Sequence, residues 1–452
     1  MKIFIAGICG TFMAGIAQIA QSANHRISGC DANAYPPMST LLKKKGIDVR
    51  SGYDERHIDP DVDQVIIGNA LSRGNVLVEA VLNNGLRFQS GPGWLHDQIL
   101  VNRQVVAVAG THGKTTTSSM VTWMLQVAGK SPGFLIGGKP GNFDNSAQIG
   151  TGEHFVIEAD EYDTAFFDKR SKFVHYSPNI AILNNLEFDH ADIFSNLDEI
   201  KTQFHHLIRL IPQNGHIVLN ADDQNLKEVI AMGHWSHVHE ISTQNKEAEW
   251  FATPLTRDGG SFELYHFGKK VHTVKWSGLG SHNMQNALAA IAGASLCGVP
   301  LESSVQALST FISADRRLQH LFERDGIHLY EDFAHHPTAI KYTLDTLKAK
   351  YPNHLLIAAI EPRSNTMKSG CHNDKLGPAL DSADIAFVYQ PTEQGWNTTD
   401  IQSDATLISC QNKQELLEKV RLRLTANSVI ICMSNGGFDG IPTALKDQLQ
   451  VA

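Results

Sequence analysis

The sequence predicts an α/β protein of three consecutive units, each built on a parallel sheet. Two observations predict this fold class. Short runs of apolar and β-branched residues alternate with stretches of helical spacing along the chain, a pattern typical of doubly wound sheets. The length of 452 residues also gives room for two to four domains, each with its own core.

The first unit, expected over residues 1–104, opens with a strand, a glycine-containing turn and a helix. The turn contains Gly7 and Gly10, the helix is expected from about Met13, and Asp31 follows the second strand. Such a turn can bind a dinucleotide, with Asp31 on the ribose, but it also suits a UDP-sugar. The spacing G-x-x-G-x-x-x-x-G departs from the dinucleotide motif, so the turn alone does not decide between these ligands. Strands are expected at 2–6, 26–30 and 65–68.

The second unit, expected over residues 105–313, begins with the motif VVAVAGTHGKTTT at 105–117. An apolar strand runs into a loop with two glycines, and Lys114 and Thr115 precede a helix expected over 118–127. Backbone N–H groups and the helix N-terminus can hold a phosphate there, the lysine adds a positive charge, and the threonine hydroxyl can bind Mg²⁺. The loop is shorter than the usual phosphate-binding motif, so the alternative is a glycine-rich turn that happens to contain lysine.

Two further strands of this unit end in polar side chains that should lie near the phosphate loop. The strands are expected at 155–158 and 180–183, and the carboxyl ends of parallel strands meet at one edge of a sheet. Glu158 offers hard oxygen ligands for Mg²⁺, with a helix-capping role as the alternative. His190 is either part of the site or structural. The polar residues expected at this edge are Glu158, Asp160, Asn185, Asp189 and His190.

The third unit, expected over residues 314–452, shows the same alternation of strands and helices. Asp332 and His335 follow its first strand and could contact a nucleotide. Arg363 with Asn365 offers a planar guanidinium beside a hydrogen-bonding group, which suits a carboxylate; the alternative is an exposed, solvated arginine. Strands are expected at 327–330, 355–360, 385–389 and 428–433.

The composition argues against several classes of protein. A net charge of −9 with no run of Lys or Arg argues against a general nucleic-acid-binding protein. No segment reaches the ~20 apolar residues that a membrane-spanning helix needs, and the glycines in the apolar N-terminus make a signal peptide the weaker interpretation. Six scattered cysteines without a C-x-x-C pair favour reduced thiols in a cytoplasmic protein over disulfides or a zinc site.

Five separated motifs resemble those of the Mur ligase family, and the resemblance covers the chain from Lys2 to the C-terminus. They are GTHGKTTT, EADEYD, NNLEFDHAD, GSHNMQNALAA and DFAHHPTAI, in this order. Members of this family are ATP-dependent ligases that build the peptide of the bacterial cell wall. EPRSNTMK and MSNGGF are similar to one branch, which joins UDP-N-acetylmuramate to the tripeptide L-alanyl-γ-D-glutamyl-meso-diaminopimelate in murein recycling.

The resemblance implies a Rossmann-like N-terminal domain for the UDP-substrate and a central P-loop ATPase-type α/β domain. A C-terminal Rossmann-like α/β domain would close over ATP and bind the peptide. ATP and Mg²⁺ are the implied cofactors, and the partners are small-molecule substrates rather than nucleic acid or membrane. The substrate carboxylate would attack the γ-phosphate of ATP, and the tripeptide amine would attack the resulting acyl phosphate. The alternatives are ligation of free L-alanine within the family and, outside it, a UDP-sugar or dinucleotide-dependent oxidoreductase.

The resemblance also implies roles for individual residues. Catalysis is expected from Lys114, Glu158 and His190, and metal binding from Thr115, Glu158 and His190. ATP would contact Gly110, Thr111, His112, Gly113, Lys114, Thr115, Thr116, His282, Asn283, Asn286, Arg317, Asp332 and His335. The UDP-substrate would contact Gly10, Thr11, Phe12, Asp31 and Asn69, and the peptide Arg363 and Asn365. Several members carry a carbamylated lysine where this chain has His205, so no carbamate is expected here.

Overall fold

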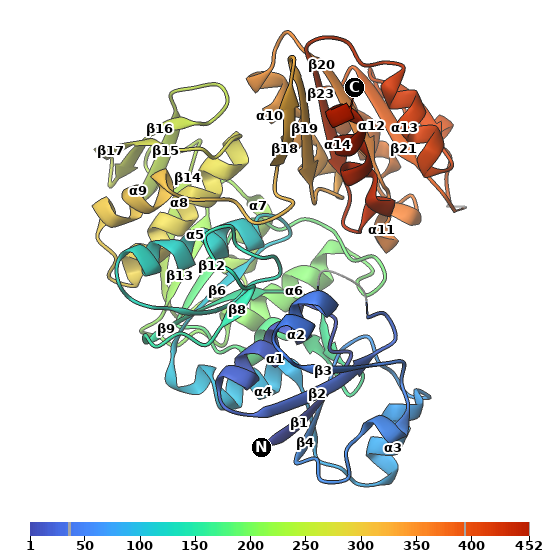
Figure 1. The fold of residues 1–452 in the computed structure, drawn as a ribbon. Coiled ribbons are helices and arrows are strands. Elements are labelled where there is room, and N and C mark those ends of the chain that lie inside the picture. The colour runs from blue at the N-terminus through green and yellow to red at the C-terminus, as the bar shows by residue number, and fades with distance from the viewer. Residues whose placement is uncertain (35–37, 393–394, 452) are drawn as a thin grey trace.

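The N-terminal unit is a five-stranded parallel sheet in the order β3-β2-β1-β4-β5, seen at the bottom of Figure 1. The computed structural model describes residues 1–34, 38–392 and 395–451. The strands of this sheet are β1 (Lys2–Ala6), β2 (Arg26–Asp31), β3 (Asp48–Ser51), β4 (Gln64–Ile67) and β5 (Phe88–Ser90). The helices are α1 (Thr11–Ser22), α2 (Met38–Lys44), α3 (Val76–Asn83) and α4 (Gly91–Gln98).

The central unit is built on a ten-stranded sheet in the order β17-β16-β15-β14-β13-β12-β6-β9-β7-β8. It is parallel from β15 to β7, and antiparallel strands extend both edges. The strands are β6 (Gln104–Ala109), β7 (Gly133–Leu135), β8 (Ala147–Gln148), β9 (His154–Ala159), β12 (Ile180–Leu183), β13 (His216–Asn220), β14 (His237–Ser242), β15 (Trp250–Pro254), β16 (Ser261–His266) and β17 (Lys269–Lys275). The helices are α5 (Lys114–Val127), α6 (Leu197–Ile208), α7 (Gln224–Ala231), α8 (Ser281–Leu296) and α9 (Leu301–Ser309). A separate hairpin, β10 (Asp163–Ala165) and β11 (Asp168–Ser171), leads into the short 3-10 helix η3 (Lys172–His175).

The C-terminal unit, orange to red in Figure 1, is a six-stranded sheet in the order β18-β19-β23-β20-β21-β22. Only the edge strand β18 is antiparallel to its neighbour. The strands are β18 (Gln319–Arg324), β19 (Ile327–Asp332), β20 (Leu355–Ile360), β21 (Ile385–Tyr389), β22 (Thr406–Cys410) and β23 (Ser428–Met433). The helices are α10 (Pro337–Lys350), α11 (Asn365–Lys368), α12 (Asn373–Leu380), α13 (Lys413–Arg421) and α14 (Ile441–Val451).

Strand β6 lies inside the central sheet and is buried on both faces. Val106 and Val108 contribute to one apolar cluster, together with residues of α5 and α8, whereas Val105, Ala107 and Ala109 contribute to another. A strand buried on both faces reads as a continuous apolar run, which is why its residues show no alternation with polar ones. Packing between the two apolar clusters fixes the position of β6. It therefore also fixes the start of the phosphate loop, which follows the carboxyl end of this strand.

Each strand expected from the sequence is present within two residues of its predicted bounds. Two helices begin earlier than expected, α1 at Thr11 rather than about Met13 and α5 at Lys114 rather than Ser118. The run of threonines after Lys114 lowers the expected helix propensity, because β-branched side chains are restricted in a helix. In the structure, Gly113 adopts a left-handed conformation that ends the loop, and the threonines form the first turn.

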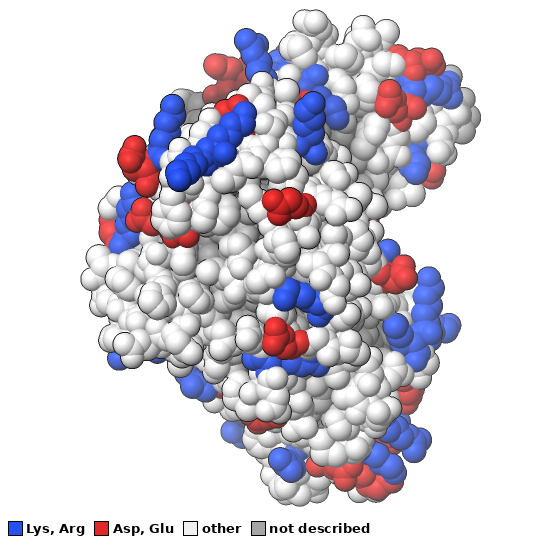
Figure 2. Space-filling view, turned by 90° about the vertical axis from the view of Figure 1, so that its left-hand side faces the viewer, with Lys and Arg blue, Asp and Glu red and all other residues white. Residues whose placement is uncertain are grey.

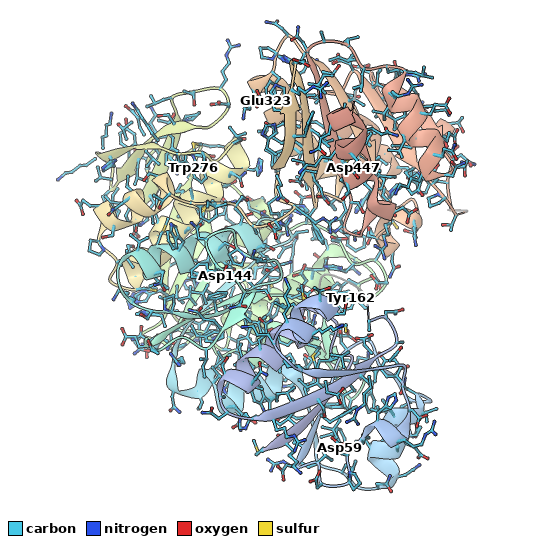
Figure 3. The ribbon with its side chains drawn as sticks, viewed as in Figure 1. Asp59, Asp144, Tyr162, Trp276, Glu323 and Asp447 are labelled. Atoms are coloured by element: carbon cyan, nitrogen blue, oxygen red, sulfur yellow. The ribbon has the colours of Figure 1, made fainter. Side chains whose placement is uncertain are left out.

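The surface carries both signs of charge. On the face shown in Figure 2, Lys and Arg side chains are interspersed with Asp and Glu over the part of the surface that is described. Tyr162, labelled in Figure 3, lies where the N-terminal elements meet those of the central unit. Among the described residues, no helix combines the length and apolar character needed to cross a membrane.

Candidate active site

The phosphate loop is braced by the end of β12 and by α8. The N–H of Thr111 donates to the carbonyl oxygen of Asn185 at 3.1 Å, and the N–H of His112 donates to the Asn185 side chain at 2.8 Å. Gly113 has φ = 78°, and a Cβ at this position would collide with the side-chain oxygen of Asn286. The positive φ favours glycine, and a larger residue would also have to displace the Asn286 side chain. The loop is held ready to receive an anion at the N-terminus of α5.

Lys114 belongs to a buried network of charges. Its Nζ lies 3.0 Å from Glu161 Oε2 and 4.0 Å from Asp160 Oδ1, and Glu161 Oε1 lies 3.3 Å from His190 Nε2. Burial favours the neutral lysine, but the charges of Glu161 and Asp160 outweigh it and raise the pKa of Lys114. Burial likewise opposes the charge on His190, yet Glu161 raises the pKa of this imidazole to about 9. Both side chains are therefore positively charged at neutral pH.

Thr115 and Glu158 form a second group of donors beside the loop. The hydroxyl of Thr115 donates to Glu158 and lies 3.1 Å from each of its carboxylate oxygens, and the N–H of Gly137 donates to Oε2 at 2.7 Å. Hydroxyl and carboxylate oxygens are the hard donors that Mg²⁺ prefers, so these two residues fit a magnesium ion. His190 is grouped instead with Asp160 and Glu161, and their ligand atoms all lie within 4.8 Å of one another.

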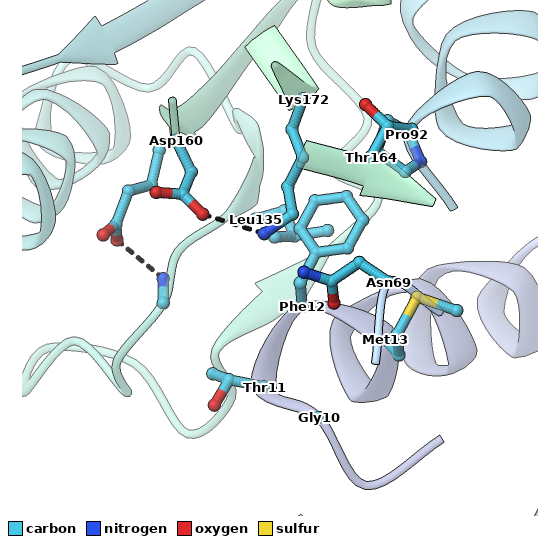
Figure 4. Close-up of a pocket in the computed structure, with 12 residues that line it drawn as sticks. Gly10, Thr11, Phe12, Met13, Asn69, Pro92, Leu135, Asp160, Thr164 and Lys172 are labelled. Carbon is cyan, nitrogen blue, oxygen red and sulfur yellow. Dashed lines mark hydrogen bonds and ion pairs between the residues drawn. The ribbon is translucent and has the colours of Figure 1, made fainter. Parts of the chain in front are cut away.

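A cavity of about 260 Å³ connects the first unit to these groups (Figure 4). On one side it is lined by the N-terminus of α1 and by Asn69, and on the other by Glu158, Asp160 and Lys172. Helix α1 has no side chain capping its N-terminus, so its first N–H groups are free to bind an anion. The cavity thus brings together the residues predicted for a UDP-substrate and those predicted for metal and phosphate. The predicted UDP-substrate residues that line it are Gly10, Thr11, Phe12 and Asn69.

Asp31 is the one predicted UDP-substrate residue that is not among the described lining residues of this cavity. Its two carboxylate oxygens accept hydrogen bonds from the N–H groups of Cys9 and Asn33, each at 2.9 Å. The side chain is buried, with 8% of the residue exposed. In this structure Asp31 holds the first turn in shape.

Arg317 reaches from the start of the C-terminal unit to the phosphate loop. Its guanidinium donates to Thr115 Oγ1 at 2.9 Å and lies 4.8 Å from the ring centroid of Phe333. Asp332 accepts hydrogen bonds from the N–H groups of Leu318 (2.5 Å) and Ala334 (2.7 Å), and thereby joins the segment before β18 to the segment after β19. Burial raises the pKa of the Asp332 carboxyl, opposed by the charge of Arg317.

Helix α8 brings the predicted histidine and asparagines to the same edge. The ring of His282 stacks on Tyr342 of α10, with centroids 5.4 Å apart and planes inclined by 6°. Asn283 donates to the carbonyl of Leu279 at 2.7 Å and accepts from Asn286 at 3.2 Å. Burial, followed by the charge of His112, lowers the pKa of His282 to about 4. This imidazole is therefore neutral near pH 7.

Hydrogen bonds join the C-terminal unit to the central one around this site. Thr338 donates to Glu187 at 2.6 Å, and Thr366 donates to Asp189 at 3.1 Å. His335, also in this region, has its Nδ1 2.9 Å from the carbonyl oxygen of Phe333. The C-terminal unit is therefore in direct contact with the segments that carry the charged network.

The two predicted peptide residues lie at the edge of this contact. Asn365 donates to Asp192 of the central unit at 3.2 Å. Arg363 is exposed, packs against Gly436, and forms no hydrogen bond or ion pair with the residues that the structure describes. Its guanidinium is available to an incoming ligand.

Three family models match successive parts of the chain. They are the Mur ligase family catalytic domain at residues 2–102, the Mur ligase middle domain at 108–294 and the Mur ligase glutamate ligase domain at 316–436. The chain belongs to the Mur ligase family. The family resemblance and the fold class expected from the sequence are confirmed.

Three relatives show how closely this Mur ligase follows its family. UDP-N-acetylmuramate–L-alanyl-γ-D-glutamyl-meso-2,6-diaminoheptandioate ligase of Escherichia coli is 50% identical over 453 residues, covering 99% of this chain and 98% of the relative. The ligase of the same name from Haemophilus influenzae is 48% identical over 452 residues, covering 99% of both chains. The crystal structure of a murein peptide ligase from Psychrobacter arcticus is 43% identical, with a TM-score of 0.78, and covers 99% of this chain and 98% of that one.

Two charged residues of this Mur ligase site were not singled out from the sequence. Glu161 joins Lys114 to His190, and Lys172 lines the cavity. Glu161 lies within EADEYD, where the motif shows acidic residues but not which of them turns inward. Lys172 follows a short hairpin, and a single lysine after a hairpin carries no local signal of function.

Proposed function

We propose that this protein is an ATP-dependent ligase that joins UDP-N-acetylmuramate to the tripeptide L-alanyl-γ-D-glutamyl-meso-diaminopimelate. The names of the relatives that are 48% and 50% identical over the full chain support this substrate pair. The observation that carries the proposal is the shared cavity, since it joins the uncapped N-terminus of α1 to Glu158 beside the phosphate loop. A ligase of this kind needs an anionic UDP-substrate to reach the γ-phosphate of ATP, and this cavity offers such a path.

The chemistry assigns distinct tasks to the residues of the central unit. A carboxylate that attacks a triphosphate must overcome like-charge repulsion, which Lys114 would offset with its positive charge. Thr115, Glu158 and His190 would hold Mg²⁺, His190 as a neutral imidazole, and the metal supplies further positive charge at the phosphates when it is bound. The phosphate loop would bind the triphosphate through its N–H groups, with Gly110, Thr111, His112, Gly113 and Thr116 around it.

The remaining predicted residues have tasks that follow from their places in the fold. Arg317 would complete the nucleotide site from the C-terminal unit, Asp332 and His335 would support it, and α8 would contribute His282, Asn283 and Asn286. The UDP-substrate would be bound by Gly10, Thr11, Phe12, Asp31 and Asn69, and Asp31 would also shape their turn. Arg363 and Asn365 would bind the peptide. We propose domain boundaries at 104/105 and 313/314 for this division of labour.

The reaction would proceed through an acyl phosphate that the tripeptide amine attacks, releasing phosphate and leaving an amide. Because water would hydrolyse such an intermediate, the C-terminal unit should cover the site during turnover. The contacts of Thr338 and Thr366 with the central unit support this closed arrangement. A substrate linked to UDP and a dependence on ATP are consistent with a cytoplasmic reaction, which we include in the proposal.

The test is an assay of ADP release with UDP-N-acetylmuramate, comparing the tripeptide with free L-alanine. We expect turnover with the tripeptide and little with alanine. Turnover with alanine alone would overturn the choice of amine substrate while leaving the ligase chemistry intact. No ADP release with either amine, from protein that binds ATP, would overturn the ligase proposal.

A further inference from the structure

Lys172 occupies a distinctive place in the cavity between the first and central units. Among the described residues that line the cavity, it alone carries a positive charge. It begins η3, directly after the β10–β11 hairpin, and its side chain points toward Phe12 and Asn69 of the first unit in Figure 4. The N-terminus of α1 lies on the opposite wall.

The surroundings of Lys172 fix its ammonium group without using all of its donors. Its Nζ donates to Asp160 Oδ2 at 2.8 Å and lies 5.9 Å and 5.6 Å from the ring centroids of Phe12 and Tyr162. Only 12% of the side chain is exposed. An ammonium group has three N–H donors, and among the described residues one of them is engaged, with Asp160, so two remain for a ligand.

Asp160 links Lys172 to the phosphate loop. Its other oxygen, Oδ1, lies 4.0 Å from Nζ of Lys114. One carboxylate therefore stands between two lysines, the first facing the cavity and the second facing the phosphate-binding site. A substrate carboxylate bound to Lys172 would lie beside Asp160, whose other oxygen faces Lys114 of the phosphate loop.

We propose that Lys172 binds the carboxylate of the UDP-linked sugar and orients it toward the phosphate loop. This assignment rests on the proposed function, because it presumes a UDP-linked acid as substrate. The donor carries two separated anionic groups, the diphosphate and the carboxylate. The N–H groups at the start of α1 suit the diphosphate, as helix N-termini commonly bind phosphates. The substrate carboxylate then requires a separate cation on the side of the cavity lined by Glu158 and Asp160. Lys172 is the cationic side chain on that side.

Two ligands separate this assignment from a role on the diphosphate. UDP-N-acetylmuramate and UDP-N-acetylglucosamine share the nucleotide, the diphosphate and the hexose, but only the first carries the lactyl carboxylate. Their affinities are to be measured by calorimetry, without ATP, for the full-length wild type and for Lys172→Met. The matched control is Lys169→Met, because Lys169 lies on the same hairpin, is 69% exposed and pairs with Asp163 outside the lining of the cavity.

We expect Lys172→Met to weaken binding of UDP-N-acetylmuramate by about 10- to 100-fold, the usual effect of losing a hydrogen bond between charged groups. Binding of UDP-N-acetylglucosamine should change less than about threefold, which also shows that the variant is folded. Lys172→Arg should recover part of the loss, and Lys169→Met should bind both ligands as the wild type does.

Other results would overturn the assignment in distinguishable ways. An equal loss for both ligands would place Lys172 on the diphosphate, and no loss for either would make it structural. Failure of the wild type itself to bind UDP-N-acetylmuramate would instead overturn the proposed function, and this assignment with it.

Discussion

The guanidinium of Arg317 donates a hydrogen bond to the hydroxyl of Thr115 at 2.9 Å, although 202 positions separate the two residues in the chain. Thr115 lies in the first turn of the helix that follows the phosphate loop, and Arg317 belongs to the segment that leads into the C-terminal sheet. The same hydroxyl is bonded to Glu158. One threonine thus connects the C-terminal unit to the donors expected to hold Mg²⁺, so the position of that unit and the binding of nucleotide should depend on each other.

Substitution of Arg317 tests this connection. We expect Arg317→Ala to lower kcat/KM for ATP by about 10- to 100-fold, because a charge-assisted hydrogen bond is lost at the nucleotide site. The affinity for UDP-N-acetylmuramate should be unchanged. Steady-state ADP release at varied ATP measures the effect, and Arg324→Ala is the control, since Arg324 is an exposed arginine of the same unit paired with Asp325. An unaltered kcat/KM for ATP would show that the contact is incidental.

Replacement of Lys114 should separate catalysis from binding of the UDP-substrate. We expect Lys114→Ala to lower the rate of ADP release at least ~100-fold, because the variant lacks the charge that offsets repulsion at the phosphates. Calorimetry with UDP-N-acetylmuramate should give an affinity within about threefold of the wild type. Loss of binding together with turnover would show that the first two units do not divide these tasks.

The stability of this variant must be measured alongside, because Glu161 would keep a buried charge without its lysine. Removing one partner of a buried ion pair costs about 3–5 kcal/mol, and Glu161 is only 2% exposed. The remaining pair with His190 should reduce that cost. A thermal melt of Lys114→Ala beside the exposed Lys169→Ala distinguishes a folded, inactive enzyme from an unfolded one.

The sequence predicted the strands and the phosphate loop well, because both depend on local features. A buried parallel strand is an apolar run, and glycine at position 113 is favoured by its own backbone angle. The site roles of Glu161 and Lys172 depend instead on the direction in which each side chain points after a strand or hairpin ends. They also depend on which residues from distant parts of the chain lie opposite them. The position of Asp31 near the end of β2 predicts ligand binding, and the structure adds a second role, since each of its oxygens accepts a backbone hydrogen bond within the first turn.

The neutral imidazole of His282 should make the protein sensitive to acid. Its pKa of about 4 lies below the ~6.5 of a histidine in an unfolded chain. The unfolded state therefore binds the proton more tightly, and the free energy of unfolding should fall as the pH drops from about 6.5 toward 4. At pH 5 the loss from this group should be about 2 kcal/mol.

Urea unfolding at pH 7.5 and pH 5 measures this loss. His282→Asn should lose about 2 kcal/mol less than the wild type over this interval, because asparagine does not titrate. His234→Asn is the control, since His234 is exposed. If His282→Asn loses as much stability as the wild type, another group governs the acid sensitivity.

Arg363 offers the test of how the peptide is recognised. Its exposed guanidinium packs against Gly436 and forms no hydrogen bond or ion pair with the described residues, as expected of a group that binds a substrate carboxylate. We expect Arg363→Ala to raise KM for the tripeptide by about 10- to 100-fold, while KM for ATP changes less than about threefold. The control is Lys368→Ala, since Lys368 is an exposed cation at the end of α11.

A shortened peptide shows which part of the substrate Arg363 contacts. The dipeptide L-alanyl-γ-D-glutamate lacks diaminopimelate, so wild-type enzyme and Arg363→Ala should use it with similar KM values if the arginine binds the diaminopimelate end. If Arg363→Ala raises KM for the dipeptide as much as it raises KM for the tripeptide, the arginine contacts the glutamyl carboxylate instead. If KM rises equally for tripeptide and ATP, Arg363 supports the C-terminal unit as a whole and does not select the peptide. The reason is that a direct contact with the peptide should affect KM for the tripeptide more than KM for ATP, which binds elsewhere.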